Sequence, residues 1–242
     1  MTPAAALLLA GSAGAERILY SEAFDGAGSV LNGKIATTGG VAWSANSIAT
    51  DNGVLTPDAG SAVLPVALEP NHIYTLSIDF DYTSGTGGWL GLGFSSSAAV
   101  TNPGGSTTGD RFSNNNVPGF SWMIYKDDNT VSVFEGPKAG TTVLPSSGTF
   151  SDGPHTLKIV IDTSGDGTTF TADFFVDDVS VTGGPQLIDA ITVAEIKSVG
   201  FTQYGSGRLT GSTIDDFSLT DIAFAPWNPL PASGTDRSAT EV

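Results

Sequence analysis

Cysteine is absent from the 242 residues, and basic residues are scarce: nine lysines and arginines stand against 25 aspartates and glutamates. Without cysteine the chain has no disulfide and no thiol nucleophile. The net charge of −16 argues strongly against a nucleic acid partner, because binding phosphate needs clustered lysine and arginine. The same charge disfavours docking on anionic lipid. Long apolar runs are also missing, so no segment is expected to insert into a membrane.

Glycine, by contrast, is abundant, with 31 residues, and Ser, Thr, Asn and Asp accompany it. These residue types suit short strands joined by many turns. Hydrophobic residues make up 40% of the chain and are spread along it, which argues against global disorder. Nothing in the middle has the composition of a linker. The sequence therefore predicts one all-β domain with a large two-sheet core.

Alternation of polar and apolar residues is clearest from His72 to Tyr82. The even-numbered side chains of this stretch are predicted to face the core. Residues 187–194 are the only candidate for a helix, and a short one. A long polar loop is expected at 95–117. Further short strands are predicted at 18–24, 41–43, 53–55, 62–64, 89–94, 120–125, 130–134, 155–162, 168–176, 179–182, 196–203 and 212–220.

Two terminal segments flank the predicted sandwich, which spans 17–224. Residues 1–16 hold a short apolar run followed by Ala13-x-Ala15, the pattern of a signal peptidase site, which favours export. No lysine or arginine precedes that run, so the alternative is an N-terminal arm that stays on the protein. Residues 225–242 are proline-rich and are expected to be an extended or disordered tail.

Three stretches carry short motifs of a known kind. Residues 152–178 give Asp-Gly-x-His before an apolar strand, then a turn and a strand that ends in Phe-Val-Asp-Asp. Residues 207–219 contain Ile-Asp-Asp, and residues 21–26 contain Phe-Asp-Gly. Together they resemble the concanavalin A-like, laminin G-like family, although Pro154 stands where that family usually has tryptophan.

This resemblance implies a two-sheet antiparallel β-sandwich of the jelly-roll type, without catalytic activity. The strand that opens with residues 21–26 is expected to pair with the closing strand at 212–220. Carbohydrate-binding jelly rolls open and close with similar strands. Both subtypes, laminin G-like and carbohydrate-binding, therefore stay open.

Catalytic acids are not evident. Glycoside hydrolases of this fold flank the scissile bond with two carboxylates, usually presented as Glu-x-Asp-x-Glu on one strand. That triplet is absent, and none of the six glutamates has an acidic residue two positions away. His72 and His155 both open apolar strands, which is typical of structural histidines. The sequence therefore predicts a protein that is not an enzyme.

A structural calcium ion is a candidate cofactor, since jelly rolls often share one ion between the opening and closing strands. Ca²⁺ takes oxygen ligands from carboxylates, amides and carbonyls. If the resemblance holds, Asp25 faces Asp215 and Asp216 across the paired strands, and Glu22 could join them. The alternative is that these acids cap turns and face water.

A sugar site needs exposed aromatic rings that stack on pyranose faces, beside polar groups that bind the hydroxyls. The candidate polar groups are in the long loop, at residues 114–116. The alternative for Trp89 and Trp122 is a place in the core, because both lie within apolar strands. The predicted ligand-binding set is Trp89, Asn114, Asn115, Asn116, Trp122, Tyr125 and Tyr204.

These features predict a non-enzymatic binding or adhesion module, secreted or on the cell surface, whose partner is a glycan or a protein surface. The alternative is a structural subunit of an assembly, such as a phage decoration or fibre protein of a virion, or a surface filament. In that case the two terminal segments would bridge neighbouring copies and order on contact.

Overall fold

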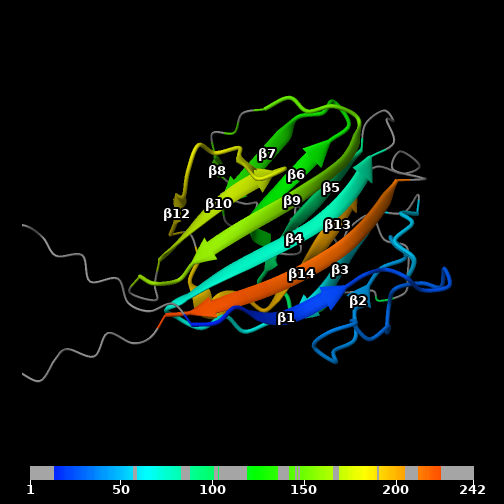
Figure 1. Ribbon diagram of the computed structural model, residues 1–242, viewed down its shortest axis with the longest axis horizontal. Coiled ribbons are helices and arrows are strands. Elements are labelled where there is room, and N and C mark those ends of the chain that lie inside the picture. Colours follow the sequence, from blue (N-terminus) through cyan, green and yellow to red (C-terminus); the bar gives the residue numbers. More distant parts are fainter. Residues whose placement is uncertain are drawn as a thin grey trace, which may run out of the picture.

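The chain is described here by a computed structural model, which shows two packed β-sheets (Figure 1). The structure describes residues 14–56, 59–82, 88–100, 103, 119–135, 142–144, 146, 148–165, 169–189, 191–204 and 212–224. Segments 1–13 and 225–242 lie outside these ranges, and so do the tail contacts predicted for them. Within the described ranges, no helix is long and apolar enough to cross a membrane.

The first sheet has seven strands in the order β1-β14-β4-β9-β10-β11, with β12 also paired to β10. In Figure 1 it lies in front of the second sheet. All its strand pairs are antiparallel. Its strands are β1 (Arg17–Glu22), β14 (Thr213–Ala223), β4 (His72–Tyr82), β9 (Gly153–Asp162), β10 (Phe170–Val176), β11 (Val179–Ser180) and β12 (Gln186–Ile188).

The second sheet also has seven strands, in the order β2-β3-β13-β5-β6-β7-β8. Its pairs are likewise antiparallel, so the predicted two-sheet antiparallel sandwich is confirmed. Its strands are β2 (Ser44–Ala45), β3 (Gly60–Pro65), β13 (Ser198–Tyr204), β5 (Trp89–Ser95), β6 (Gly119–Lys126), β7 (Val131–Glu135) and β8 (Thr142–Leu144).

The opening and closing strands pair as the motifs predicted. Glu22 of β1 lies opposite Phe217 of β14, and Arg17 lies opposite Asp221. The pairing continues to the end of the sandwich, where the backbone N–H of Gly14 donates to the carbonyl of Ala223 at 2.8 Å. The first and last strands therefore meet at one corner, which Figure 1 shows as blue beside orange.

The core fills the space between the sheets. In β4 the side chains of Tyr74, Leu76, Ile78 and Phe80 are at most 1% exposed, as the alternation predicted. An aromatic cluster closes one part of this core around Trp43, whose ring centroid lies 5.0 Å from that of Phe217. Removing such apolar surface from water is the main favourable term in folding.

The two sheets differ in their outward faces. In the first sheet, β9 and β10 alternate between buried and half-buried residues, as a sheet with one solvated face does. In the second sheet, β3, β13 and β5 are buried at nearly every position, on both faces. The central strands of the second sheet are thus covered on the outside as well.

Several predicted elements differ from the structure. The short helix expected at 187–194 is wrong: strand β12 takes its first residues, and a single 3-10 turn follows at Val193–Glu195. Residues 41–43 were expected to form a strand, but the strand in this region is β2, which comprises Ser44 and Ala45. Residues 53–55 contribute only isolated bridges, and β8 had no counterpart in the prediction.

Candidate functional site

Two of the predicted sugar-stacking residues lie together on the outward face of the second sheet. Trp89 begins β5 and Tyr204 ends β13, and the strand register places them opposite each other. Their ring centroids are 5.7 Å apart, with 30° between the ring planes. Tyr204 is 42% exposed and Trp89 is half-buried. Lys126 of β6 lies opposite Trp89 on its other side, so a cation adjoins the aromatic pair.

Tyr125 belongs elsewhere. It is 1% exposed, its ring lies 5.9 Å from that of Phe80, and its hydroxyl donates to the carbonyl of Ser151 at 3.0 Å. This places its ring in the core rather than on a face that a sugar could reach. The side chain of Trp122 and residues 114–116 lie outside the described residues.

The middle of the same outward face is closed. Gly91 of β5 lies opposite Thr202 of β13, and a Cβ on Gly91 would come within 2.8 Å of the Thr202 methyl group. The Ser61 hydroxyl donates to the Thr202 hydroxyl at 3.0 Å, and both residues are buried. Among the outward positions of β5 and β13, Trp89 and Tyr204 are therefore the ones that solvent reaches.

The predicted calcium site does not form. The carboxylate of Glu22 is buried and accepts bonds from the backbone N–H of Phe24 at 3.2 Å and the indole N–H of Trp43 at 3.4 Å. Asp25 is exposed. Among the described residues, no three acids or histidines lie close enough together to hold a metal ion. The four acids predicted for calcium therefore do not come together as one ligand set.

The strand register explains this correction. Asp215 lies opposite Asp79 of β4. On the other edge of β14, β1 pairs only as far as Glu22 opposite Phe217, and beyond it Val54 lies opposite Thr213. Asp216 follows at a bulge, with φ at 46°. Partial desolvation, and then the charges of Asp215 and Asp79, raise the pKa of Asp216. These acids repel one another on a solvated face instead of meeting Glu22 and Asp25.

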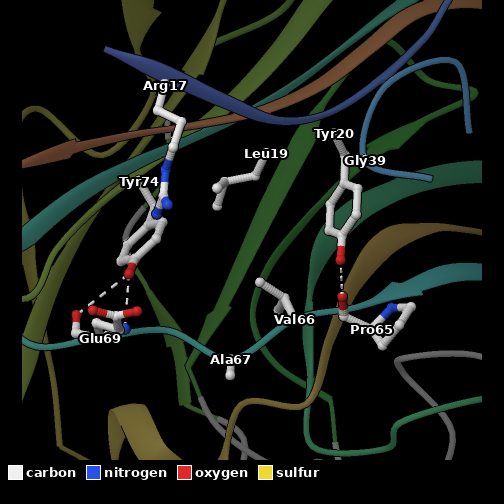
Figure 2. A pocket seen from close by; sticks show the side chains of 9 residues that line it. All are labelled: Arg17, Leu19, Tyr20, Gly39, Pro65, Val66, Ala67, Glu69 and Tyr74. Carbon is white, nitrogen blue, oxygen red and sulfur yellow. Dashed lines mark hydrogen bonds between the residues drawn. The ribbon is translucent and has the colours of Figure 1, made fainter. Parts of the chain in front are cut away.

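A cavity of about 470 Å³ lies beside β1, at the open side of the sandwich, and the sequence did not predict it. Figure 2 shows Tyr20 of β1 reaching to Pro65, the last residue of β3, and Tyr74 of β4 reaching to Glu69 in the segment that follows. The Tyr20 hydroxyl donates to the carbonyl of Pro65 at 2.5 Å. The Tyr74 hydroxyl accepts from the backbone N–H of Glu69 at 2.7 Å. The two phenol rings thus form opposite walls of the cavity.

Between those walls the lining is apolar. Leu19 and Val66 project into the space between the two rings (Figure 2), and both pack against the main core. Gly39, whose φ is +100°, lines one side of the cavity. A Cβ on this residue would lie 2.4 Å from the Tyr20 ring. A side chain at residue 39 would therefore displace one wall.

Charged side chains lie at the Tyr74 side of the cavity. Arg17 donates from Nε and Nη2 to the two carboxylate oxygens of Asp221, at 2.9 and 2.8 Å. His72 places Nδ1 2.9 Å from the same carboxylate and stacks its ring on Tyr74, with centroids 5.5 Å apart. The Asp221 side chain is only 3% exposed, whereas that of Arg17 is 62% exposed. The mouth of the cavity is therefore bordered by a balanced ion pair.

No protein-family model matches the chain, and no curated protein matches it in sequence. Solved structures do match its fold. The carbohydrate recognition domain of Emp46p, in its metal-free form, is 12% identical, with 74% of this chain and 87% of that chain covered and a TM-score of 0.46. An endo-1,3-beta-glucanase from Streptomyces sioyaensis is 14% identical, with 91% and 99% covered and a TM-score of 0.46.

A legume lectin-like domain from Entamoeba histolytica is 14% identical, with 70% of this chain and 82% of that chain covered and a TM-score of 0.44. The likeness to all three is one of fold.

The ion pair beside the cavity predicts how stability depends on pH. Hydrogen bonds from Arg17 and then from His72 lower the pKa of Asp221 below its ordinary 3.8. A carboxylate whose folded pKa is lowered stabilises the protein above its unfolded pKa, and that contribution is lost as the pH falls through the folded pKa.

We therefore expect Asp221→Asn to reduce the free energy of unfolding by about 2 kcal/mol near neutral pH, because hydrogen bonds to charged groups are lost. The difference from the unsubstituted protein should shrink as the pH falls below about 4. Urea denaturation followed across pH measures both quantities. Exposed Asp25→Asn serves as the control, with a small effect at neutral pH. A difference for Asp221→Asn that stays constant down to acid pH would contradict this prediction.

Proposed function

We propose that the chain is a non-enzymatic glycan-binding module that engages saccharides at the Trp89–Tyr204 end of the second sheet. The observation that carries this proposal is the pairing of two aromatic rings, 5.7 Å apart, on an outward sheet face with Tyr204 exposed. We further propose that it works outside the cell or on a virion, which the Ala13-x-Ala15 pattern supports for export.

The chemistry of the pair supports saccharides in particular. A sugar presents an apolar C–H face that packs on aromatic rings and a rim of hydroxyls that needs hydrogen bonds. Lys126, beside Trp89 in the register, carries three N–H donors for such hydroxyls. Aromatic residues also bury contact area at a low cost in conformational entropy, since they have only two χ angles.

A glycan array probed with the full chain tests this function. We expect binding to a limited set of glycans, and we expect Tyr204→Ala to weaken it at least about tenfold, the equivalent of 1.4 kcal/mol. Leu187→Ala is the matched control, because Leu187 is 57% exposed on the other sheet and its loss should leave binding unchanged.

Two results would count against the proposal. One is the absence of binding to any glycan, with or without a chelator. The other is binding that Tyr204→Ala and Leu187→Ala weaken equally, since the effect would then not arise at the aromatic pair. The chelator arm also tests whether calcium contributes to binding by a route that the described residues do not show.

A further inference from the structure

The cavity between Tyr20 and Tyr74 is separate from the aromatic pair, and the function proposed above does not use it. Its volume of about 470 Å³ lies within the range of small-molecule sites, roughly 300–1,000 Å³. Its two tyrosines come from β1 and β4, and the rest of its lining includes Pro65 of β3 and the segment after it. Trp89 and Tyr204 are not among the lining residues. The cavity therefore needs its own explanation.

The charges around the cavity exclude two classes of ligand. An anion would meet the exposed carboxylate of Glu69, and the charge of Arg17 is already balanced by the buried Asp221. A cation would meet the Arg17 guanidinium, whose side chain is 62% exposed at the mouth. A ligand without net charge avoids both penalties.

The remaining hydrogen-bonding capacity favours hydroxyl groups. Arg17 has five N–H donors, and the two bonds to Asp221 leave three for a ligand. The Glu69 side chain is 69% exposed, so its carboxylate accepts bonds from outside the protein. A hydroxyl both donates and accepts, and it can therefore use both groups.

The apolar part of the cavity lining favours a ligand that also has aliphatic C–H groups. Tyr20 and Tyr74 offer aromatic rings on opposite sides, and Leu19 and Val66 lie between them (Figure 2). Rings in this arrangement pack against aliphatic C–H groups. A ligand that combines C–H faces with a rim of hydroxyls, and that carries no net charge, matches all of these surfaces.

We propose that the cavity lined by Arg17, Tyr20, Glu69 and Tyr74 is a second, independent binding site for a neutral sugar ring. The ring lies between the two tyrosines, and its hydroxyls bond to the guanidinium and the carboxylate. This site does not depend on glycan binding at Trp89 and Tyr204, because neither of these residues lines the cavity.

The test uses amide chemical shifts of the full chain, titrated with the methyl glycosides of glucose, galactose, mannose, xylose and arabinose at millimolar concentration. We expect at least one of them to shift the amides of Leu19, Val66 and Ala67. Ala67→Trp should weaken that binding at least about tenfold, because the exposed Ala67 borders the cavity and an indole there would fill it.

Ala27→Trp, which adds the same bulk at another exposed alanine, is the matched control and should bind as the unsubstituted protein does. Glu69→Gln keeps the shape and removes the charge, so it should weaken binding without changing which amides shift. If Ala67→Trp does not fold, the shift map of the unsubstituted protein decides alone.

The same titration separates this site from the proposed function. Shifts at Leu19 and Val66 without shifts at Trp89 and Tyr204 would support the cavity and count against the aromatic pair. The reverse pattern would overturn the cavity proposal and leave the function intact. No shift at Leu19, Val66 or Ala67 with any of the five glycosides would also overturn it.

Discussion

Replacing Trp43 with alanine is expected to lower the free energy of unfolding by about 4 kcal/mol, because the change leaves a large cavity in a packed core. The Trp43 side chain is 1% exposed, and its ring lies 5.0 Å from that of Phe217 and 5.7 Å from that of Phe201. These partners come from β14 and β13, so the ring joins the two sheets. Since domains are stable by only about 5–15 kcal/mol, the loss is a large share of the total.

Urea denaturation measures this loss, and Trp43→Phe separates its parts. Phenylalanine keeps most of the packing but removes the indole N–H that donates to Glu22. We therefore expect Trp43→Phe to cost less than Trp43→Ala but to leave the buried Glu22 carboxylate with one fewer donor. A cost below about 1 kcal/mol for Trp43→Ala would contradict the packing described here.

Gly53→Ala is expected to destabilise the protein by about 3 kcal/mol or more. Gly53 has a φ of +74°, and a Cβ there would lie 2.1 Å from the carbonyl oxygen of Ile214. The Gly53 carbonyl also accepts the backbone N–H of Ile214 at 2.9 Å, so the loop cannot move away without breaking that bond. A positive φ alone costs roughly 1–2 kcal/mol for an L-residue, and the clash adds to it.

Gly33→Ala is the matched control for that prediction. Gly33 has a similar φ of +80°, yet nothing lies within 4 Å of its added Cβ. It should therefore show the cost of the backbone conformation alone. Thermal or urea unfolding of both variants gives the difference, and equal losses would show that the contact with Ile214 imposes no cost of its own.

The sequence predicts the strands of the sandwich well where one face of the strand is exposed to solvent. From Tyr74 to Phe80 in β4 the polar and apolar residues alternate, so both the strand and its core face could be assigned. It also predicts that the Phe-Asp-Gly strand pairs with the Ile-Asp-Asp strand. Strands buried on both faces, such as β5, give no such alternation, and their apolar residues do not show which side faces the core.

The candidate sites depend on register, which the sequence does not fix. Arg17 and Asp221 are 204 residues apart and become partners only because β1 and β14 pair with a bulge between Ile18 and Tyr20. Moving the register by one residue would turn every side chain to the other face. The four acids predicted for calcium do not come together for the same reason: β1 pairs with β14 only as far as Glu22 opposite Phe217, and Val54 lies opposite Thr213 beyond it.

The aromatic residues show the same limit in another form. Trp89 and Tyr204 were both predicted, and the pairing of β5 with β13 brings them together. Tyr125 was predicted with them, but its position on β6 turns its ring inward, toward His155 at 5.2 Å. Nothing in an aromatic residue itself indicates which side of a strand it occupies when both sides are buried.

The corner where the first and last strands meet also determines how the sandwich would be oriented relative to a tether. Ala223 pairs with His72 at the start of β4, while Trp89 follows the far end of that strand. The first and last of the eleven residues of β4 lie about 33 Å apart, at a rise of roughly 3.3 Å from each residue to the next. Both attachment points leave from one pole, so a tethered copy would present its aromatic pair at the opposite pole, directed away from the tether.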